Sequence, residues 1–173
     1  TGYYDTPNYM NVPGEDQPHV YHYFREAHPF ADQNVVVIGG KNSAIDVALE
    51  LQIAGANVTM VYRRKAFSDS VKPWIKPVIE SAIRHQRIKM MWGSEVLEIL
   101  SQSVRIKQGE TILEIPADSV FAMTGYRPDL ELLKNAGAEI DPETAAPIFS
   151  EHMETTVPGL YICGVIAAGK DAS

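Results

Sequence analysis

The sequence contains a single cysteine, Cys163, among its 173 residues. One cysteine excludes an internal disulfide and a CxxC redox pair within the chain. No apolar run approaches the roughly 20 residues that a membrane-spanning helix needs, and the first residues do not resemble a signal peptide. We therefore expect no membrane partner, and we take the cytoplasm as the default location.

The sequence also has no excess of positive charge, because 15 Lys and Arg stand against 22 Asp and Glu, for a net charge of −7. This balance does not suggest a nucleic-acid-binding surface. The hydrophobic content of 45% and charged content of 21% are ordinary for a globular protein, and 173 residues allow one good-sized domain with an appended lobe. Because the chain opens at Thr1-Gly2 without methionine, we expect a fragment or an excised domain.

A standard spacing of metal ligands is missing as well. His19, His22 and His28 lie close together, but their spacing fits no standard ligand set, and no cysteine or acidic cluster joins them. We expect structural or surface histidines and no metal. Trp74 is expected to pack in the core rather than to serve as a ligand platform, and Cys163 to be a buried small hydrophobic residue in an apolar strand.

What the sequence does contain is a strand, a glycine turn and a helix in immediate succession. The four β-branched residues 35–38 are typical of a strand that is buried on both faces of a parallel sheet. Gly39 and Gly40 interrupt this run, an apolar helical pattern follows, and Asn42 or Ser43 is expected to cap the helix. Such a unit binds phosphate in dinucleotide folds, because the turn lets the backbone approach the pyrophosphate and the helix start offers free N–H groups.

The glycine fingerprint is imperfect. In the pattern G-x-G-x-x-G/A, Gly39 holds the first position and Ala44 the third, but Lys41 takes the second, where glycine normally clears space for the pyrophosphate. The Lys41 side chain either blocks the nucleotide or, if it turns aside, adds a cation for phosphate. Taken alone, this degenerate motif is equally compatible with an ordinary turn between a strand and a helix.

A second strand is expected over Asn57–Tyr62, with Arg63 and Arg64 at its end. An acidic side chain at this place binds the ribose of NAD, whereas arginine accommodates the 2′-phosphate of NADP. The spacing from the glycine turn favours phosphate recognition over an ordinary solvated strand end, and it predicts a preference for NADPH over NADH. The polar loop 65–72 could close over this phosphate with Lys72 as a further contact, although a plain solvated loop is an equal alternative.

The remaining patterns predict an α/β fold. We expect a helix from Pro73, a third strand over 88–92, short antiparallel strands over 96–99, 104–107 and 112–115, a returning strand over 118–123, a helix over 130–135 and an apolar strand over 160–163. Together these elements indicate a Rossmann-like, three-layer NAD(P)-binding domain with a parallel sheet and an inserted antiparallel β-meander.

Four landmarks together resemble the thioredoxin-reductase-like branch of the two-dinucleotide flavoprotein reductases. They are Thr1-Gly2 with Pro13-Gly14-Glu15, similar to the hinge that leaves an FAD domain; Gly39–Ala44 with Tyr62-Arg63-Arg64, similar to the NADPH site; Thr124–Asp129, similar to the return hinge; and Thr156–Gly164, similar to the strand that revisits the flavin. The resemblance implies an NADPH-binding domain over 19–124, between remnants of an FAD-binding domain over 1–18 and 125–173.

Further stretches, residues 22–29 and 72–74, look like the bacillithiol-disulfide-reductase group of this branch. That group uses FAD and NADPH, lacks CxxC, and carries its reactive cysteine in the N-terminal part of the FAD domain, which is absent here. Tyr23–Glu26 stands where thioredoxin reductases carry CxxC, which excludes dithiol transfer to thioredoxin by that route. Val165 follows Gly164 where the family has an aspartate for the ribityl chain, which leaves FAD contact through this residue open.

The resemblance also implies residue roles. Pyrophosphate binding is expected of Gly39, Gly40, Asn42, Ser43 and Ala44, with Lys41 as an additional cation, and 2′-phosphate binding of Arg63, Arg64 and Lys72. Asp46, one turn into the helix, matches an acidic position near the nicotinamide half, with a solvated helix residue as an equal alternative. Gly125 and Gly164 complete the expected cofactor contacts, and no catalytic residue is expected in this chain.

The implied activity is hydride transfer from NADPH to FAD and then to a low-molecular-weight disulfide such as bacillithiol disulfide, with the chain inactive by itself. A homo-oligomer is compatible with this interpretation. Three alternatives stay open: a ferredoxin–NADP reductase of thioredoxin-reductase type, a non-catalytic NADPH-sensing module, and a structural Rossmann remnant in which Lys41 abolishes nucleotide binding.

Overall fold

The computed structural model describes residues 6–171 and divides them into two compact units. The larger unit is Tyr9–Thr124, and the smaller unit combines residues 6–8 with residues 125–171. Thr1-Gly2, which belongs to the expected hinge, lies outside the described residues. Among the helices of residues 6–171, none has the length and apolar content required to cross a membrane.

The larger unit is built on a parallel sheet with the strand order β1-β8-β2-β3-β4. The strands are β1 (Val20–Tyr21), β2 (Asn34–Ile38), β3 (Asn57–Tyr62), β4 (Ile88–Trp92) and β8 (Ser119–Ala122). The central strand β2 lies between β3 and β8, and all of its residues after Asn34 are buried. This burial explains why its sequence is continuously apolar rather than alternating.

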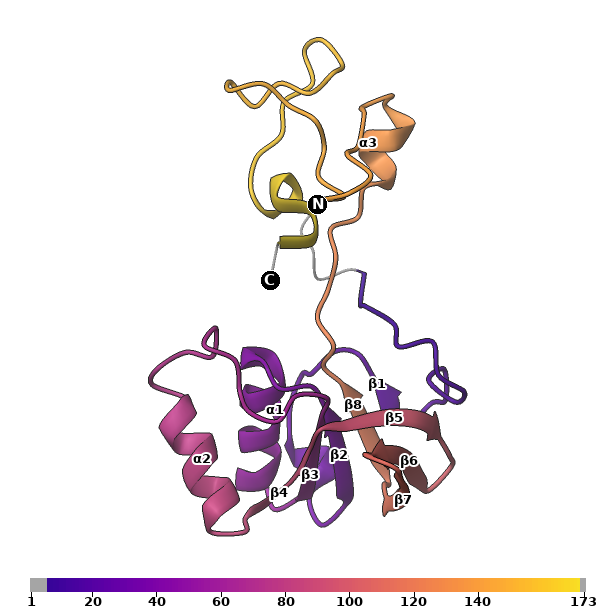
Figure 1. Ribbon diagram of the computed structural model, residues 1–173, viewed down its shortest axis with the longest axis vertical. Coiled ribbons are helices and arrows are strands. Elements are labelled where there is room, and N and C mark those ends of the chain that lie inside the picture. The colour runs from indigo at the N-terminus through magenta and orange to yellow at the C-terminus, as the bar shows by residue number, and fades with distance from the viewer. Residues whose placement is uncertain (1–5, 172–173) are drawn as a thin grey trace. The chain divides into compact units, whose positions relative to one another are not determined.

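Two different layers cover this sheet (Figure 1). Val35 and Val37 of β2 pack in one cluster with the helices α1 (Asn42–Ile53) and α2 (Lys76–Arg84). Val36 and Ile38 point the other way, into a second cluster with an antiparallel sheet. That sheet consists of β5 (Ser94–Ile99), β6 (Ser103–Gln108) and β7 (Thr111–Pro116). The expected three-layer α/β fold with an inserted antiparallel meander is therefore confirmed.

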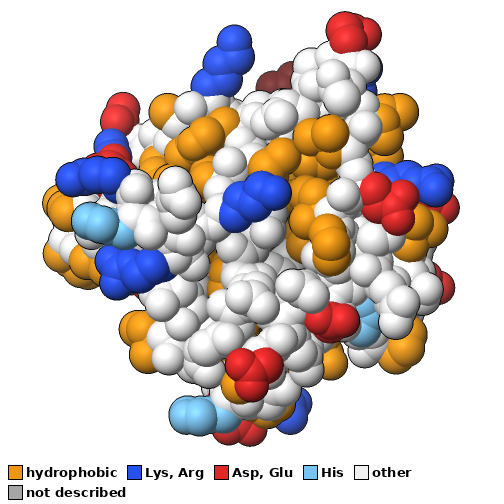
Figure 2. Space-filling model, turned by 90° about the horizontal axis from the view of Figure 1, so that it is seen from below, with side chains coloured by type: hydrophobic (Ala, Val, Ile, Leu, Met, Phe, Trp, Pro, Cys, Tyr) orange, Lys and Arg blue, Asp and Glu red, His pale blue; other side chains and the backbone are white. Residues whose placement is uncertain are grey.

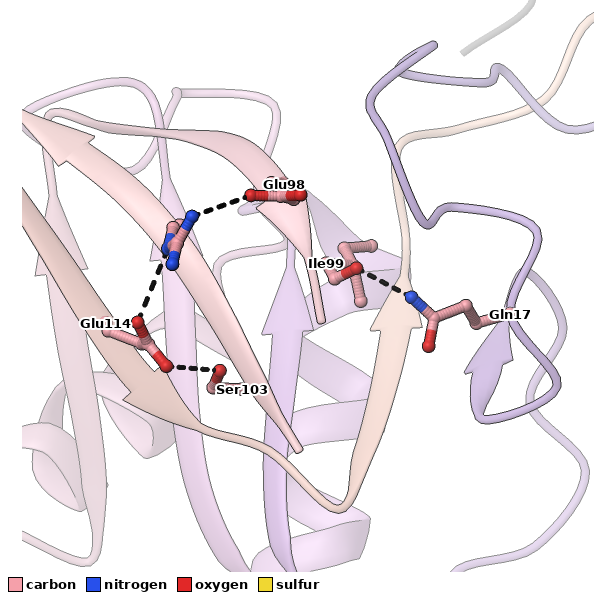
Figure 3. A network of polar contacts seen from close by, with 6 residues as sticks. Gln17, Glu98, Ile99, Ser103 and Glu114 are labelled. Atoms are coloured by element: carbon pink, nitrogen blue, oxygen red, sulfur yellow. Dashed lines mark hydrogen bonds and ion pairs between the residues drawn. The ribbon is translucent and has the colours of Figure 1, made fainter. Parts of the chain in front are cut away.

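Charged side chains connect the three strands of the meander on its solvent side. Arg105 of β6 donates to Glu98 at 3.0 Å and to Glu114 at 3.4 Å, and the Ser103 hydroxyl donates to Glu114 at 2.7 Å (Figure 3). The hydrogen bonds from Ser103 and Arg105 lower the pKa of the exposed Glu114 carboxyl. These contacts cross-link neighbouring strands on the meander's outer face.

Residues 9–18 fall in the larger unit, whereas the sequence analysis expects a domain boundary after residue 18. The Gln17 side chain donates to the Ile99 carbonyl at 2.7 Å (Figure 3), and the Ile99 N–H donates to the Pro13 carbonyl at 2.9 Å. A Cβ at Gly14 would lie 1.9 Å from the Ile99 carbonyl oxygen, so the segment and the end of β5 approach too closely for any other residue. The expected boundary after 124 coincides with the division into units.

The smaller unit has little regular structure. It holds the short helix α3 (Glu131–Asn135), a 3-10 segment over Val165–Asp171 and isolated bridges, with a small core of Leu133, Ala138, Ile162 and Ile166. The strand expected over 160–163 is wrong, because this run makes only the bridge from Tyr161 to Glu154 within the described residues. An apolar run of four residues carries too little periodicity to distinguish a strand from an irregular packed segment.

A buried glutamate, Glu15, and the partly buried His22 form a pair near the start of the larger unit. Glu15 is 7% exposed, and its carboxylate accepts the backbone N–H groups of Met10 at 2.9 Å and Asn11 at 2.7 Å. The Nε2 atom of His22, whose side chain is 12% exposed, lies 3.9 Å from this carboxylate. Burial lowers the pKa of His22 below its ordinary 6.5, and the charge of Glu15 opposes this shift in part.

Residues 6–171 hold no cluster of three or more potential ligands for a metal.

The pair of Glu15 and His22 predicts a loss of stability in acid. Unfolded His22 takes up its proton near pH 6.5 and folded His22 only at lower pH, so the free energy of unfolding falls as the pH drops below about 6.5. His22→Gln should weaken this pH dependence in urea titrations at pH 7.5 and 5, whereas His28→Gln, at an exposed position, should not. An equal pH dependence in wild type and His22→Gln would contradict the assignment.

Candidate functional site

The turn after β2 leaves no room for side chains at its two glycines. A Cβ at Gly39, where φ is +137°, would lie 2.5 Å from the Met123 carbonyl oxygen and 2.9 Å from the Ala44 Cβ. A Cβ at Gly40 would lie 2.5 Å from the ring of Tyr62. The first glycine thus lets β8 and α1 close around the turn, and the second lets the turn rest against the last side chain of β3.

Helix α1 begins directly after this turn. Lys41 is its exposed N-cap residue, in extended conformation, and the Lys41 carbonyl accepts the Ile45 N–H at 3.1 Å. The expected cap by Asn42 or Ser43 is wrong, because the described contacts include no side-chain cap hydrogen bond at this helix. Since the first turn of a helix has N–H groups without intrahelical partners, the start of α1 offers donors and a positive dipole end.

The Asn42 side chain instead holds the loop that follows β3. Its Oδ1 accepts the Lys72 N–H at 2.9 Å, and its Nδ2 donates to the Ser70 carbonyl at 3.2 Å. Phe67 and Val71 anchor the same loop in the helix-side core, where they are 9% and 3% exposed. Thirty positions separate Asn42 from Lys72, and no local pattern in the sequence reveals this bridge.

The predicted cations lie at the same edge of the sheet as the turn. Because β2 and β3 are parallel and in register from Asn34–Asn57 to Ile38–Val61, their carboxyl ends meet at one edge. Arg63 and Arg64 follow β3 directly and are exposed. The Arg64 carbonyl accepts the Gly93 N–H at 3.0 Å, which fixes the backbone of this pair. Lys72 is also exposed, on the loop that Asn42 holds.

The other predicted site residues divide between the two units. Ser43 is exposed, Ala44 is buried at the start of α1, and Asp46 is half-buried one turn into the helix. Gly125 and Gly164 belong to the smaller unit, with φ of +94° and +80°. The Gly125 carbonyl accepts the Asn8 N–H at 2.9 Å, and the Gly164 carbonyl accepts the Ala167 N–H at 3.1 Å.

Two side chains that were expected to be buried lie in solvent. Trp74 is 72% exposed, because it sits in a turn before α2 and leaves the core contacts of this helix to Ile79 and Ala82. Cys163 is exposed because Ile162 and Ile166 supply the buried positions around it.

The amino edge of the sheet, opposite the turn, differs in its distribution of charged side chains. Basic, acidic and apolar side chains are interspersed on the face that Figure 2 shows, without a gathering of one sign. A pocket of about 260 Å³ opens at the starts of β2, β3 and β4, with Arg87 and Lys89 in its lining. The glycine turn, the start of α1 and the exposed Arg63 and Arg64 lie instead at the carboxyl edge, where ligands bind in open α/β sheets.

Residues 1–164 match the family described as pyridine nucleotide-disulphide oxidoreductase. The chain belongs to this family. Bacilliredoxin reductase Bdr from Bacillus subtilis is 54% identical over 175 residues, which cover 100% of this chain and 54% of that protein. Ferredoxin–NADP reductase from Ignicoccus hospitalis is 31% identical over 169 residues, which cover 92% of this chain and 52% of that protein.

The fold agrees with this family membership. The structure of bacillithiol disulfide reductase Bdr from Bacillus cereus superimposes with a TM-score of 0.95 at 51% identity, and the match covers 99% of this chain and 53% of that one. The chain thus spans about half the length of the relatives that it matches.

The bridge from Asn42 to the loop after β3 gives a direct prediction. Asn42→Ala removes the acceptor of the Lys72 N–H, so this amide should exchange its hydrogen faster, and the free energy of unfolding should fall by about 0.5–1.5 kcal/mol. Asn42→Asp is the matched control, since it keeps the acceptor oxygen for Lys72. Unchanged protection of Lys72 in Asn42→Ala, measured by NMR hydrogen exchange, would contradict this geometry.

Proposed function

We propose that this chain is the NADPH-binding part of a flavin-dependent oxidoreductase. In this proposal the longer protein passes a hydride from NADPH to FAD and then to a low-molecular-weight disulfide such as bacillithiol disulfide. The observation that supports it best is that three features lie at one edge of the sheet. They are the turn at Gly39 and Gly40, which has no room for a Cβ, the start of α1, which none of the described side chains caps, and the Arg63–Arg64 pair.

The residues of this edge fit a dinucleotide. A Cβ at either glycine of the turn would collide with neighbouring atoms, so no side chain stands between the backbone of the turn and a ligand. In the proposal, N–H groups at the start of α1 bind the pyrophosphate, and the exposed Lys41 adds a cation beside it. Bound NADPH would supply the hydride, while the protein positions its reacting carbon.

In the proposal, the cations that follow β3 bind the 2′-phosphate. Arg63 and Arg64 would hold it through several charge-assisted N–H bonds, and Lys72 would supply a further positive charge from the loop fixed by Asn42. Asp46 is assigned to the nicotinamide half, in keeping with its position one turn into α1. Together these assignments make NADPH, rather than NADH, the proposed nucleotide.

The fit to FAD is weaker in this chain. Gly125 and Gly164 are proposed to line the flavin as parts of the smaller unit, but the Val165 side chain, which follows Gly164 and is 40% exposed, has no polar atom for the ribityl chain. Flavin binding would therefore depend on the remainder of the longer protein. By itself, the chain should bind NADPH and catalyse no turnover.

The electron acceptor is proposed from the names of relatives. The relatives from Bacillus subtilis and Bacillus cereus are called bacilliredoxin reductase and bacillithiol disulfide reductase. The relative from Ignicoccus hospitalis is called ferredoxin–NADP reductase, and it makes ferredoxin the second candidate acceptor. A cytoplasmic location, a homo-oligomer, and the exclusion of nucleic-acid and membrane partners stay predictions.

The nucleotide assignment is tested by removing one guanidinium at a time. Arg63→Ala or Arg64→Ala should weaken binding of adenosine 2′,5′-bisphosphate by at least about tenfold, because a charge-assisted hydrogen bond contributes about 1.5–3 kcal/mol. Binding of 5′-AMP should change little. Arg87→Ala, which removes the same charge at the opposite edge, is the control. Equal calorimetric affinities for NADPH and NADH in wild type would contradict the assignment.

The acceptor is tested with the longer protein that contains this chain. NADPH oxidation should be much faster with bacillithiol disulfide than with ferredoxin, followed by the absorbance of NADPH. Faster turnover with ferredoxin would favour the second candidate. A colourless protein that cannot be reconstituted with FAD would refute both candidates and leave a nucleotide-sensing module.

A further inference from the structure

The exposed indole of Trp74 is the feature of the larger unit that the proposed function leaves unused. It is 72% exposed, whereas the other tryptophan, Trp92, packs edge-on against Phe67 with ring centroids 4.8 Å apart. Tryptophan is a large apolar side chain that proteins keep mostly buried, and exposed aromatic rings serve as binding platforms. An indole left in solvent on the loop that borders the proposed nucleotide site is therefore a candidate contact.

The backbone of the turn that carries this indole is held by hydrogen bonds at Lys72. The Lys72 N–H is bonded to Asn42, and the Lys72 carbonyl accepts the Ile75 N–H at 3.1 Å, so Trp74 lies within a turn that starts at the tethered residue. The Lys72 ammonium rests 5.9 Å from the centroid of the indole, within the range of a cation–π contact. With most of the residue exposed, the rest of the ring surface remains accessible.

The path of a dinucleotide at this edge leads toward the ring. In dinucleotide folds the pyrophosphate lies on the glycine turn, and the adenosine ribose is read at the end of the next strand, which here is β3 with Arg63 and Arg64. The adenine is attached to this same ribose, so it lies over the connection that follows the strand. In this chain that connection runs from Arg63 to the turn of Trp74, at the start of α2.

We propose that Trp74 is the adenine platform of the site, with the purine stacked on the exposed indole and the Lys72 ammonium held beside the 2′-phosphate. This assignment rests on the proposed NADPH function and adds to it the residue that binds the base. Stacking of a base on an aromatic side chain stabilises complexes and is independent of hydrogen-bond pattern. The chemistry recognised is an adenosine that carries a 2′-phosphate.

A protein partner is the competing occupant of this surface. Val78 of α2, which is 51% exposed, is a second apolar side chain four residues after Trp74. A docked protein would be expected to use both side chains, whereas a stacked purine requires only the indole. Val78 therefore supplies the variant that separates the two interpretations.

The test measures binding of adenosine 2′,5′-bisphosphate to the chain by calorimetry. Trp74→Ala should weaken binding by about tenfold, Trp74→Phe should retain most of the affinity because it keeps a ring, and Val78→Ala should bind as the wild type does. In a Trp92→Phe background Trp74 is the remaining tryptophan, and its fluorescence should be quenched by the bisphosphate but not by inorganic pyrophosphate, which lacks the base.

The outcomes separate this inference from the function on which it rests. If the wild type binds the bisphosphate and loses affinity in Arg63→Ala, but Trp74→Ala binds normally and the fluorescence of Trp74 is unchanged, the platform is refuted and the proposed function stands. A loss of affinity in Val78→Ala equal to that in Trp74→Ala would also refute it. If neither the chain nor the longer protein binds the bisphosphate, the proposed function and this inference fail together.

Discussion

The close approach of Gly40 to the ring of Tyr62 is the constraint on which the candidate site depends. A Cβ at Gly40 would lie 2.5 Å from this ring, so the glycine turn and the end of β3 are in contact without an intervening side chain. Tyr62 is buried and directly precedes Arg63, and its ring stacks with that of Phe67, with centroids 6.4 Å apart. One aromatic ring thereby sets the separation between the turn proposed for the pyrophosphate and the cations proposed for the 2′-phosphate, and a larger residue at Gly40 would displace both.

Asn42 adds the second connection at this edge. Because its amide bonds the loop after β3 instead of capping α1, the N–H groups of the first helical turn keep their capacity for a ligand, and the loop keeps a defined position. The buried side chains of Phe67 and Val71 anchor the same loop in the core beneath α1 and α2. A site whose parts are held by packing and by side-chain hydrogen bonds needs little rearrangement to bind, which lowers the entropic cost of association.

Local sequence patterns predicted the parts of this architecture that depend on burial periodicity. The strands β3 and β4 occur at the residues expected from their apolar runs, and the glycine turn lies where Gly39 and Gly40 indicated. Contacts between distant segments were not predictable. The hydrogen bond from the Lys72 N–H to Asn42 and the attachment of residues 9–18 to β5 produce no periodic pattern in the sequence. Trp74 was misjudged because composition treats tryptophan as a core residue, whereas the turn before α2 turns it outward.

The most direct measurement is a crystal structure of the chain with NADPH bound. The account predicts the 2′-phosphate within hydrogen-bond distance of the Arg63 and Arg64 guanidinium groups, and the pyrophosphate on the N–H groups at the start of α1. Tyr62 should remain against Gly40, and the Lys41 side chain should lie beside the pyrophosphate. A nucleotide bound at another edge, or a Lys41 side chain that fills the place of the pyrophosphate while the soaked crystal shows no nucleotide, would contradict it.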